Sequence, residues 1–220
     1  MFLGGKIELK IIAAADIHGK QYRVNQLVEN VKKYRPDLVV VCGDITQFGP
    51  KDMAKVLLDQ IPVDTMAVPG NIDTEDVIEG IEESKAMNLH LKKIKWKGET
   101  FVGIGGSNPL PFRTRISYSE DEIKKELENL IEKNCILVTH VPPYGVQDRV
   151  FFGKHAGSKV LREIVEEFKP KLHLCGHIHE NPGFDKLGDT VVVNCTMARG
   201  NGGALIETNK DGIKVEMLLD

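Results

Sequence analysis

Seven side chains of types that commonly bind divalent metal ions follow five short apolar stretches of the sequence. They comprise two carboxylates, one amide oxygen and four imidazoles, a donor set that suits manganese, iron, zinc, nickel or cobalt. In two stretches the ligand-type residues are two positions apart, so they share a face of an extended strand or straddle a tight turn. The sequence therefore predicts a pair of divalent cations with these candidate ligands: Asp16, His18, Asp44, Asn71, His140, His177 and His179.

Each of these segments also has an ordinary structural explanation when it is taken alone. An Asp-x-His sequence after a strand is commonly a turn or a helix cap, and Gly43-Asp44 is a common turn. Asn71 could occupy a turn position with positive φ, and His140 could be a core histidine. His177-Ile178-His179 is the strongest single signal, because two histidines are costly to bury without partners. The ordered combination of all five favours metal binding.

Buried strands are predicted immediately before these segments. The apolar runs that end there cover residues 9–15, 38–42, 65–68, 135–139 and 172–175. Functional sites of layered α/β folds gather at the carboxyl ends of strands, so several strands can deliver their loops to one place. The spacing of the runs therefore predicts that residues far apart in the chain converge.

Segments with helical periodicity alternate with the strands, at residues 24–31, 53–60, 119–131 and 160–168. Ser119 and Glu122 form a capping box at the start of the third. From Thr190 onward the pattern is entirely β, with Asp211-Gly212 as a hairpin turn. We expect a four-layer α/β/β/α sandwich, in which two mixed β-sheets pack face to face between outer helices, as a single domain over residues 1–220.

The composition is that of an ordinary globular protein, with 41% hydrophobic and 28% charged residues among 220. The net charge of -3 argues against a large basic face for a nucleic-acid polymer. The four cysteines form no C-x-x-C pair, which predicts buried, reduced thiols. No apolar run reaches the roughly 20 residues needed to span a bilayer. Glu8 and Lys10 also interrupt the stretch that resembles an export signal. We expect a cytoplasmic protein without a membrane partner, and a homo-oligomer is compatible with the sequence.

The five segments resemble, in order, the blocks D-x-H, G-D, G-N-H-D/E, H and G-H-x-H of the calcineurin-like metallophosphoesterase superfamily. The resemblance spans residues 16–179, and the segments 139–145 and 170–180 look like the small, cyclic-nucleotide phosphodiesterase-like branch. It implies hydrolysis of a phosphodiester or a small phosphomonoester. The two metals, about 3.5–4 Å apart, would bind a bridging hydroxide that attacks phosphorus. The ligand map that it implies is Asp16, His18 and His179 for one metal, Asn71, His140 and His177 for the other, and Asp44 as the bridge.

The sequence departs from the family pattern in the third block, where Ile72 stands in place of the histidine thought to assist the leaving group. Asp73 remains, but without that histidine it could serve only to cap a helix that begins near Thr74. Loss of a general acid costs about 10²–10⁴ in rate, and least for acidic leaving groups such as phenols. His155 is a candidate substitute on the loop after His140, with a surface histidine as the alternative. The candidate catalytic residues are Asp44, Asn71, Asp73, His140 and His155.

Two further features bear on function. The loop 105–115 could fold over the site, and Arg113 or Arg115 could then meet a substrate phosphate, although ordinary surface charges are the favoured interpretation for both. A protein-interaction scaffold with a catalytically weak site is the competing interpretation, since members of the superfamily include such proteins. The complete set of seven ligand-type residues argues against it. A nuclease is disfavoured by the acidic balance of charge.

Overall fold

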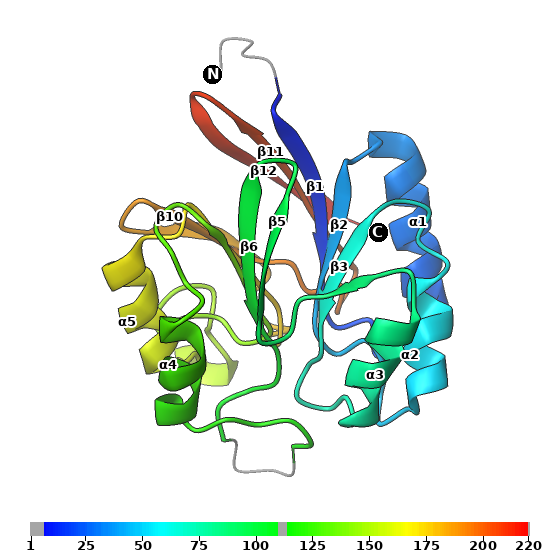
Figure 1. Ribbon diagram of the computed structural model, residues 1–220, viewed down its shortest axis with the longest axis horizontal. Coiled ribbons are helices and arrows are strands. Elements are labelled where there is room, and N and C mark those ends of the chain that lie inside the picture. Colours follow the sequence, from blue (N-terminus) through cyan, green and yellow to red (C-terminus); the bar gives the residue numbers. More distant parts are fainter. Residues whose placement is uncertain (1–6, 110–113, 220) are drawn as a thin grey trace.

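The computed structural model describes residues 7–109 and 114–219. Twelve strands of this part form two six-stranded sheets that pack face to face in the centre of the molecule (Figure 1). The first sheet has the order β12 (Gly212–Leu219), β11 (Asn201–Asn209), β1 (Leu9–Ala14), β2 (Leu38–Cys42), β3 (Thr65–Val68) and β4 (Met87–Asn88). The second has the order β5 (Lys92–Trp96), β6 (Glu99–Ile104), β7 (Ile136–Thr139), β8 (Leu172–Cys175), β10 (Thr190–Asn194) and β9 (Gly183–Leu187).

Both sheets are mixed, as predicted. The inner strands β1, β2 and β3 run parallel to one another, as do β6, β7 and β8, while β11, β12, β5 and β9 pair antiparallel with their neighbours. Strands that are covered on both faces read as continuous apolar runs, and Leu38–Cys42 is buried at every position. The parallel strands therefore bring their carboxyl ends to the same end of the molecule.

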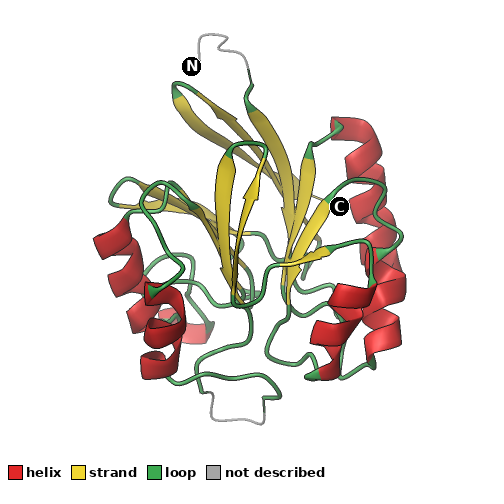
Figure 2. Ribbon diagram, viewed as in Figure 1, coloured by secondary structure: helices red, strands yellow, loops and turns green. Residues whose placement is uncertain are grey.

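Helices cover the outer face of each sheet (Figure 2). α1 (Gln21–Tyr34), α2 (Lys51–Leu58) and α3 (Asp76–Glu83) pack on the first sheet, and α4 (Glu120–Glu128) and α5 (Lys159–Phe168) on the second. Three apolar clusters fill the spaces between layers. One lies between the two sheets, around Phe101 and Ile11, and one lies under each set of helices. The predicted four-layer sandwich is confirmed.

The elements differ from the sequence prediction mainly at sheet edges. α2 covers Lys51–Leu58 instead of 53–60, and β4, β5 and β9 were not predicted. In β5 only Ile94 and Trp96 turn toward the inter-sheet core, while its lysines are exposed or half-exposed, so no buried run marks it. The capping box at Ser119 and Glu122 is confirmed, and so are four buried, unpaired cysteines. In the described part of the chain, no helix has the length and apolar character needed to cross a membrane.

Candidate metal centre

The turns after five parallel strands meet at one end of the two packed sheets. The turn after β1 is bonded to the turn after β2, because Asp16 N–H donates to Gly43 O (3.0 Å) and His18 N–H donates to Asp44 O (2.8 Å). In the second sheet, Gly176 N–H after β8 donates to the carbonyl of His140 after β7 (2.9 Å). These backbone bonds hold the candidate ligands in fixed relative positions.

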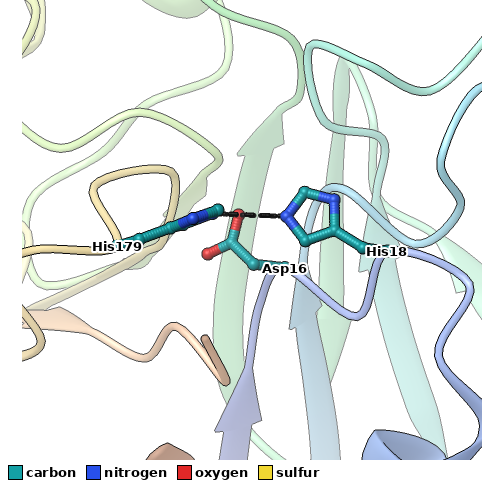
Figure 3. A group of neighbouring side chains, drawn as sticks. All are labelled: Asp16, His18 and His179. Atoms are coloured by element: carbon teal, nitrogen blue, oxygen red, sulfur yellow. Dashed lines mark hydrogen bonds and ion pairs between the residues drawn. The ribbon is translucent and has the colours of Figure 1, made fainter. Parts of the chain in front are cut away.

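The first cluster of ligand atoms consists of Asp16, His18 and His179 (Figure 3). His18 Nε2 lies 3.2 Å from His179 Nε2, and Asp16 Oδ1 lies 3.3 Å from His179 Nε2 and 3.8 Å from His18 Nε2. Atoms that are each about 2.1 Å from a shared cation lie roughly 3.0–3.4 Å apart in octahedral or tetrahedral geometry. Two of the three distances fall in this range, and the third, between Asp16 Oδ1 and His18 Nε2, is 3.8 Å, so a small side-chain movement would bring all three to one cation.

A second cluster forms around His140. His140 Nε2 lies 3.0 Å from Asn71 Oδ1 and 3.4 Å from Asp44 Oδ2. Its other ring nitrogen, Nδ1, donates to the Cys42 carbonyl at 2.8 Å, so the Nε2 lone pair faces Asn71 and Asp44. Asp44 Oδ2 is also 3.9 Å from His18 Nδ1, the ring nitrogen opposite the one that faces Asp16 and His179. Asp16, Asp44 and His140 together form a second group whose ligand atoms lie within 4.8 Å of one another.

His177 completes the group of seven. Its ring centroid lies 5.0 Å from that of His140, and its backbone N–H donates to Asp16 Oδ2 at 3.1 Å. The structure thus brings the ligand atoms of six of the seven predicted residues close together, and it places the ring of His177 beside that of His140. It also shows a contribution that the sequence did not indicate, the Cys42 carbonyl, because a backbone oxygen leaves no signal in the residue types.

Four of the seven candidate ligands have positive φ, among 13 such non-glycine residues in the described part of the chain. Asp16, His18, Asp44 and His177 have φ values of 61°, 53°, 50° and 67°, the left-handed region that costs a non-glycine residue about 1–3 kcal/mol. This conformation turns each side chain sharply off the end of its strand. Strain of this kind persists only where the surrounding structure enforces it, so four strained ligands in one cluster indicate a functional site.

Two glycines let the clusters close. A Cβ on Gly43, whose φ is 89°, would overlap the His140 ring, and a Cβ on Gly70 would overlap the carboxylate and backbone nitrogen of Asp44. The glycine in the G-D pair and the glycine before Asn71 are therefore required by close packing against ligands. Glycine is needed at these two positions because the backbone approaches the ligand side chains too closely to leave room for a Cβ.

The hydrogen bonding and charge of the site give a second, independent indication that these residues suit cations. Asp16 Oδ1 is buried, and in residues 7–109 and 114–219 no donor reaches it with hydrogen-bond geometry. Burial alone would raise the pKa of Asp16, but nearby His179 and His140 outweigh it and lower that pKa. Burial alone would lower the pKa of His140, whereas the Asp44 carboxylate raises it to about 9. The two buried carboxylates therefore draw positive charge into the centre, which divalent cations would supply.

Comparison with known proteins agrees with this geometry. The sequence pattern of calcineurin-like phosphoesterases matches residues 9–181. This chain belongs to that family. An uncharacterized protein of Methanocaldococcus jannaschii is 41% identical over 195 residues, which cover 84% of this chain and 87% of that protein. A probable glycerophosphodiester phosphodiesterase of Arcobacter nitrofigilis is 24% identical over 180 residues, 74% of this chain and 64% of that protein.

A solved structure shares the fold of this calcineurin-like phosphoesterase. The crystal structure of a Thermus thermophilus protein superposes with a TM-score of 0.75 at 15% identity, covering 96% of this chain and 99% of that one. At this level of identity the likeness concerns the fold alone.

At the family's usual histidine position, the structure shows what surrounds Ile72. Its backbone N–H donates to Asp44 Oδ1 at 3.1 Å, and its aliphatic side chain is half-buried. The expectation that Asp73 caps a helix is wrong, because α3 starts at Asp76 without a side-chain cap. Asp73 is instead fully buried and accepts hydrogen bonds from the loops after β2 and β3. Burial, followed by the charge of Asp44, raises the pKa of Asp73 to about 6.

The remaining candidates lie beside the clusters. Among described residues, the polar side-chain partner of His155 is Asp148, at 2.6 Å, and no contact joins His155 directly to a candidate ligand. The Arg115 guanidinium carbon lies 5.5 Å from the ring centre of Phe48, while its backbone N–H donates to Asn71 O at 2.8 Å. Arg113 lies outside the described residues. The role of the loop 105–115 in substrate binding stays a prediction.

Proposed function

We propose that this protein is a dinuclear metal-dependent phosphoesterase that hydrolyses a phosphodiester or a small phosphomonoester. One observation carries the proposal: two groups of ligand atoms lie next to each other, Asp16 with His18 and His179, and Asp16 with Asp44 and His140. In the arrangement that the family implies, Asp44 is the carboxylate that would serve both cations. The natural metals are among manganese, iron, zinc, nickel and cobalt, because the site mixes imidazole nitrogen with carboxylate and amide oxygen.

The charge balance of the site suits a phosphate ester. When two divalent cations are bound, they supply an activated water and neutralise charge on the phosphoryl oxygens. Within the ligand set, Asp16 and Asp44 carry the negative charge, so a centre with two divalent cations keeps a net charge of about +2. That surplus attracts an anionic phosphoryl group although the whole chain has a net charge of -3. A small substrate therefore needs no basic face elsewhere on the protein.

Orientation is the other contribution of the chain. The bond from His140 Nδ1 to the Cys42 carbonyl fixes the ring so that only Nε2 is available as a ligand. The bond from His177 N–H to Asp16 Oδ2 similarly leaves Asp16 Oδ1 as the free oxygen. A site whose ligands are held before any cation arrives spends little free energy on reorganisation. A diester substrate has support from the Arcobacter nitrofigilis relative, of whose length this chain spans 64%.

A catalytically weak interaction scaffold is the competing function, favoured only by Ile72. The backbone strain at four ligand residues argues against it, because a scaffold would gain stability by losing that strain. The direct test is to measure metal content and then screen phosphate mono- and diesters after manganese loading. We expect about two metals per chain and turnover of at least one aryl ester. A protein that binds two metals but turns over no ester would support the scaffold instead.

A further inference from the structure

The turn that carries Ile72 holds no proton donor for a leaving group. The Ile72 side chain is aliphatic, and its backbone N–H is committed to Asp44. Both oxygens of the neighbouring Asp73 accept backbone N–H groups at 2.8–3.0 Å, from Ile45, Thr46 and Gly70. An alkoxide leaving group needs a proton during bond cleavage, so another part of the site must provide it.

His155 and Asp148 form a pair of the kind that serves in proton transfer. His155 Nδ1 donates to Asp148 Oδ1 at 2.6 Å, and the Asp148 carboxylate is fully buried. Asp148 Oδ2 accepts the backbone N–H groups of Gly145 (2.9 Å) and Gly157 (3.0 Å), which fix its orientation. The imidazole retains 28% of its exposure, and Nε2 makes no hydrogen bond within the described residues. A buried carboxylate that binds Nδ1 orients the ring and leaves Nε2 as the free nitrogen.

The loop that carries this pair is bonded to the turn after β8, which bears His177 and His179. Arg149 N–H donates to Asn181 Oδ1 at 3.0 Å, and Asn181 Nδ2 donates to Gln147 Oε1 at 3.2 Å. Asn181 is two residues after His179, and Arg149 pairs with His155 in an antiparallel bridge. His155 is thus connected to the first cluster through one bridge and one hydrogen bond.

The same loop is also bonded to the segment after β7, which bears His140. Ser158 N–H donates to Pro142 O at 3.0 Å, and Tyr144 N–H donates to Ser158 O at 2.8 Å. The Tyr144 ring centroid lies 5.3 Å from that of His155. His155 therefore sits on a loop held on two sides by segments that carry ligands of the two clusters.

We propose that His155, oriented by Asp148, donates the proton that the leaving group requires, in place of the family histidine that Ile72 replaces. This inference rests on the proposed function. The bond between phosphorus and the ester oxygen breaks, and its electron pair stays on that oxygen, which takes the proton from His155 Nε2. The oxygen of the attacking water forms the new bond to phosphorus. The water proton that is released restores the imidazole through solvent, so the net reaction is ester plus water to alcohol plus phosphate. Asp148 is a positioning residue in this step.

A structural role is the alternative, in which the pair only braces the loop. The variant His155→Asn separates the two, because the asparagine amide can still donate to Asp148 but has no proton to transfer. Turnover of a manganese-loaded variant is compared on two phosphodiesters that differ only in the leaving group, which is a phenol in one and an alkyl alcohol in the other. We expect the ratio of alkyl to aryl kcat to fall by about 10²-fold, with melting temperature and metal content as in the parent protein. An unchanged ratio would overturn the proposal.

Two further variants sharpen the result. Tyr144→Phe removes the hydroxyl of the aromatic side chain whose ring lies 5.3 Å from that of His155, and it should keep the parent ratio. The double variant His155→Asn with Ile72→His restores a histidine at the family position, and it should recover part of the alkyl turnover. If the ratio of alkyl to aryl kcat fell as much in Tyr144→Phe as in His155→Asn, the tyrosine would be the proton donor and the proposal would be contradicted. If the parent protein hydrolyses neither ester, the proposed function itself fails, which is a different outcome.

Discussion

The two sheets make unequal contributions to the metal centre. Turns of the first sheet supply all three oxygen ligands and one imidazole, from Asp16, His18, Asp44 and Asn71. Turns of the second sheet supply imidazoles alone, from His140, His177 and His179. In the proposed dinuclear centre, the negative charge that would retain the cations therefore comes from one sheet, while the other sheet would provide imidazoles that complete the coordination.

Each sheet also orients ligands of the other. The Cys42 carbonyl at the end of β2 fixes the ring of His140, and the His177 N–H after β8 fixes the carboxylate of Asp16. Neither sheet by itself holds a finished half-site. The centre consequently exists only while the inter-sheet core is packed. Loss of order in the turns of one sheet should therefore be accompanied by loss of order in the turns of the other.

The largest expected effect follows from removing the charge shared by both clusters. Asp44→Ala deletes the carboxylate whose Oδ2 lies between His18 and His140, so we expect metal content to fall from two to one or fewer. Several kcal/mol of transition-state stabilisation disappear with a lost cation, which corresponds to a decrease in kcat of at least about 10³-fold. Metal analysis together with turnover of an aryl diester measures both.

The matched change on the second sheet is His179→Ala, which removes a neutral, partly exposed ligand of the first cluster. We expect a smaller loss, about 10–100-fold in metal affinity at one site, that excess manganese largely reverses. Asp189→Ala, at an exposed position on the surface, is the control for a lost carboxylate and should leave metal content at two. If His179→Ala were as damaging as Asp44→Ala at saturating metal, the division between the sheets would be wrong.

Metal removal should have an intermediate effect that tests the link between the two halves. A cation that binds only the folded state at about 100 times its dissociation constant stabilises it by about 2.7 kcal/mol, so two such sites contribute about 5 kcal/mol. Chelation should therefore lower the melting temperature by roughly 10–20 °C. Because each sheet orients ligands of the other, amide hydrogen exchange should increase together in the turns at residues 16–18, 43–44 and 176–179. An increase confined to the turns of one sheet would contradict this expectation.

The layered fold and the candidate ligands could largely be predicted from the sequence. Strand ends are marked by apolar runs, and the ligand-type residues that follow them are conspicuous, so the layered fold and the seven candidate ligands could be predicted, although their binding of metal stays a prediction. Edge strands were not, because β5 and β9 are largely exposed and present few buried residues. Their positions depend on pairing with a neighbouring strand, which a local pattern does not reveal.

Side-chain partners inside the site were harder to predict than its members. Asp73 follows Asn71 closely and suggests a helix cap, yet its carboxylate faces the amides of Ile45, Thr46 and Gly70. Asp148 drew no attention in the sequence, although its place seven residues before His155 is the one available signal for the pair. Such partners are chosen by the contact between loops, and loop geometry is not encoded in periodicity.

The smallest expected effect concerns a histidine of the second sheet that is not a ligand. His173, in β8, is fully buried four residues before His177. Its Nε2 lies 2.8 Å from Thr139 Oγ1, whose own hydroxyl faces the Val141 carbonyl, so His173 acts as the donor. Burial lowers the pKa of His173 to about 3, from an ordinary value of 6.5. The ring is therefore neutral in the folded protein above about pH 4.

This assignment predicts a specific pH dependence of stability. Between about pH 6 and pH 4 the unfolded chain binds a proton at residue 173 that the folded chain does not, so His173 destabilises the fold by about 1.4 kcal/mol per pH unit as the pH falls. Above about pH 7 both states are neutral and the term vanishes. His173→Gln keeps an amide donor for Thr139 but cannot titrate, so denaturant unfolding of the metal-free variant should show a shallower decline than the metal-free parent. If stability fell equally steeply with pH in the variant and the parent, His173 would take up a proton as easily in the folded as in the unfolded chain. The buried imidazoles of the second sheet would then not divide into candidate ligands and neutral core residues.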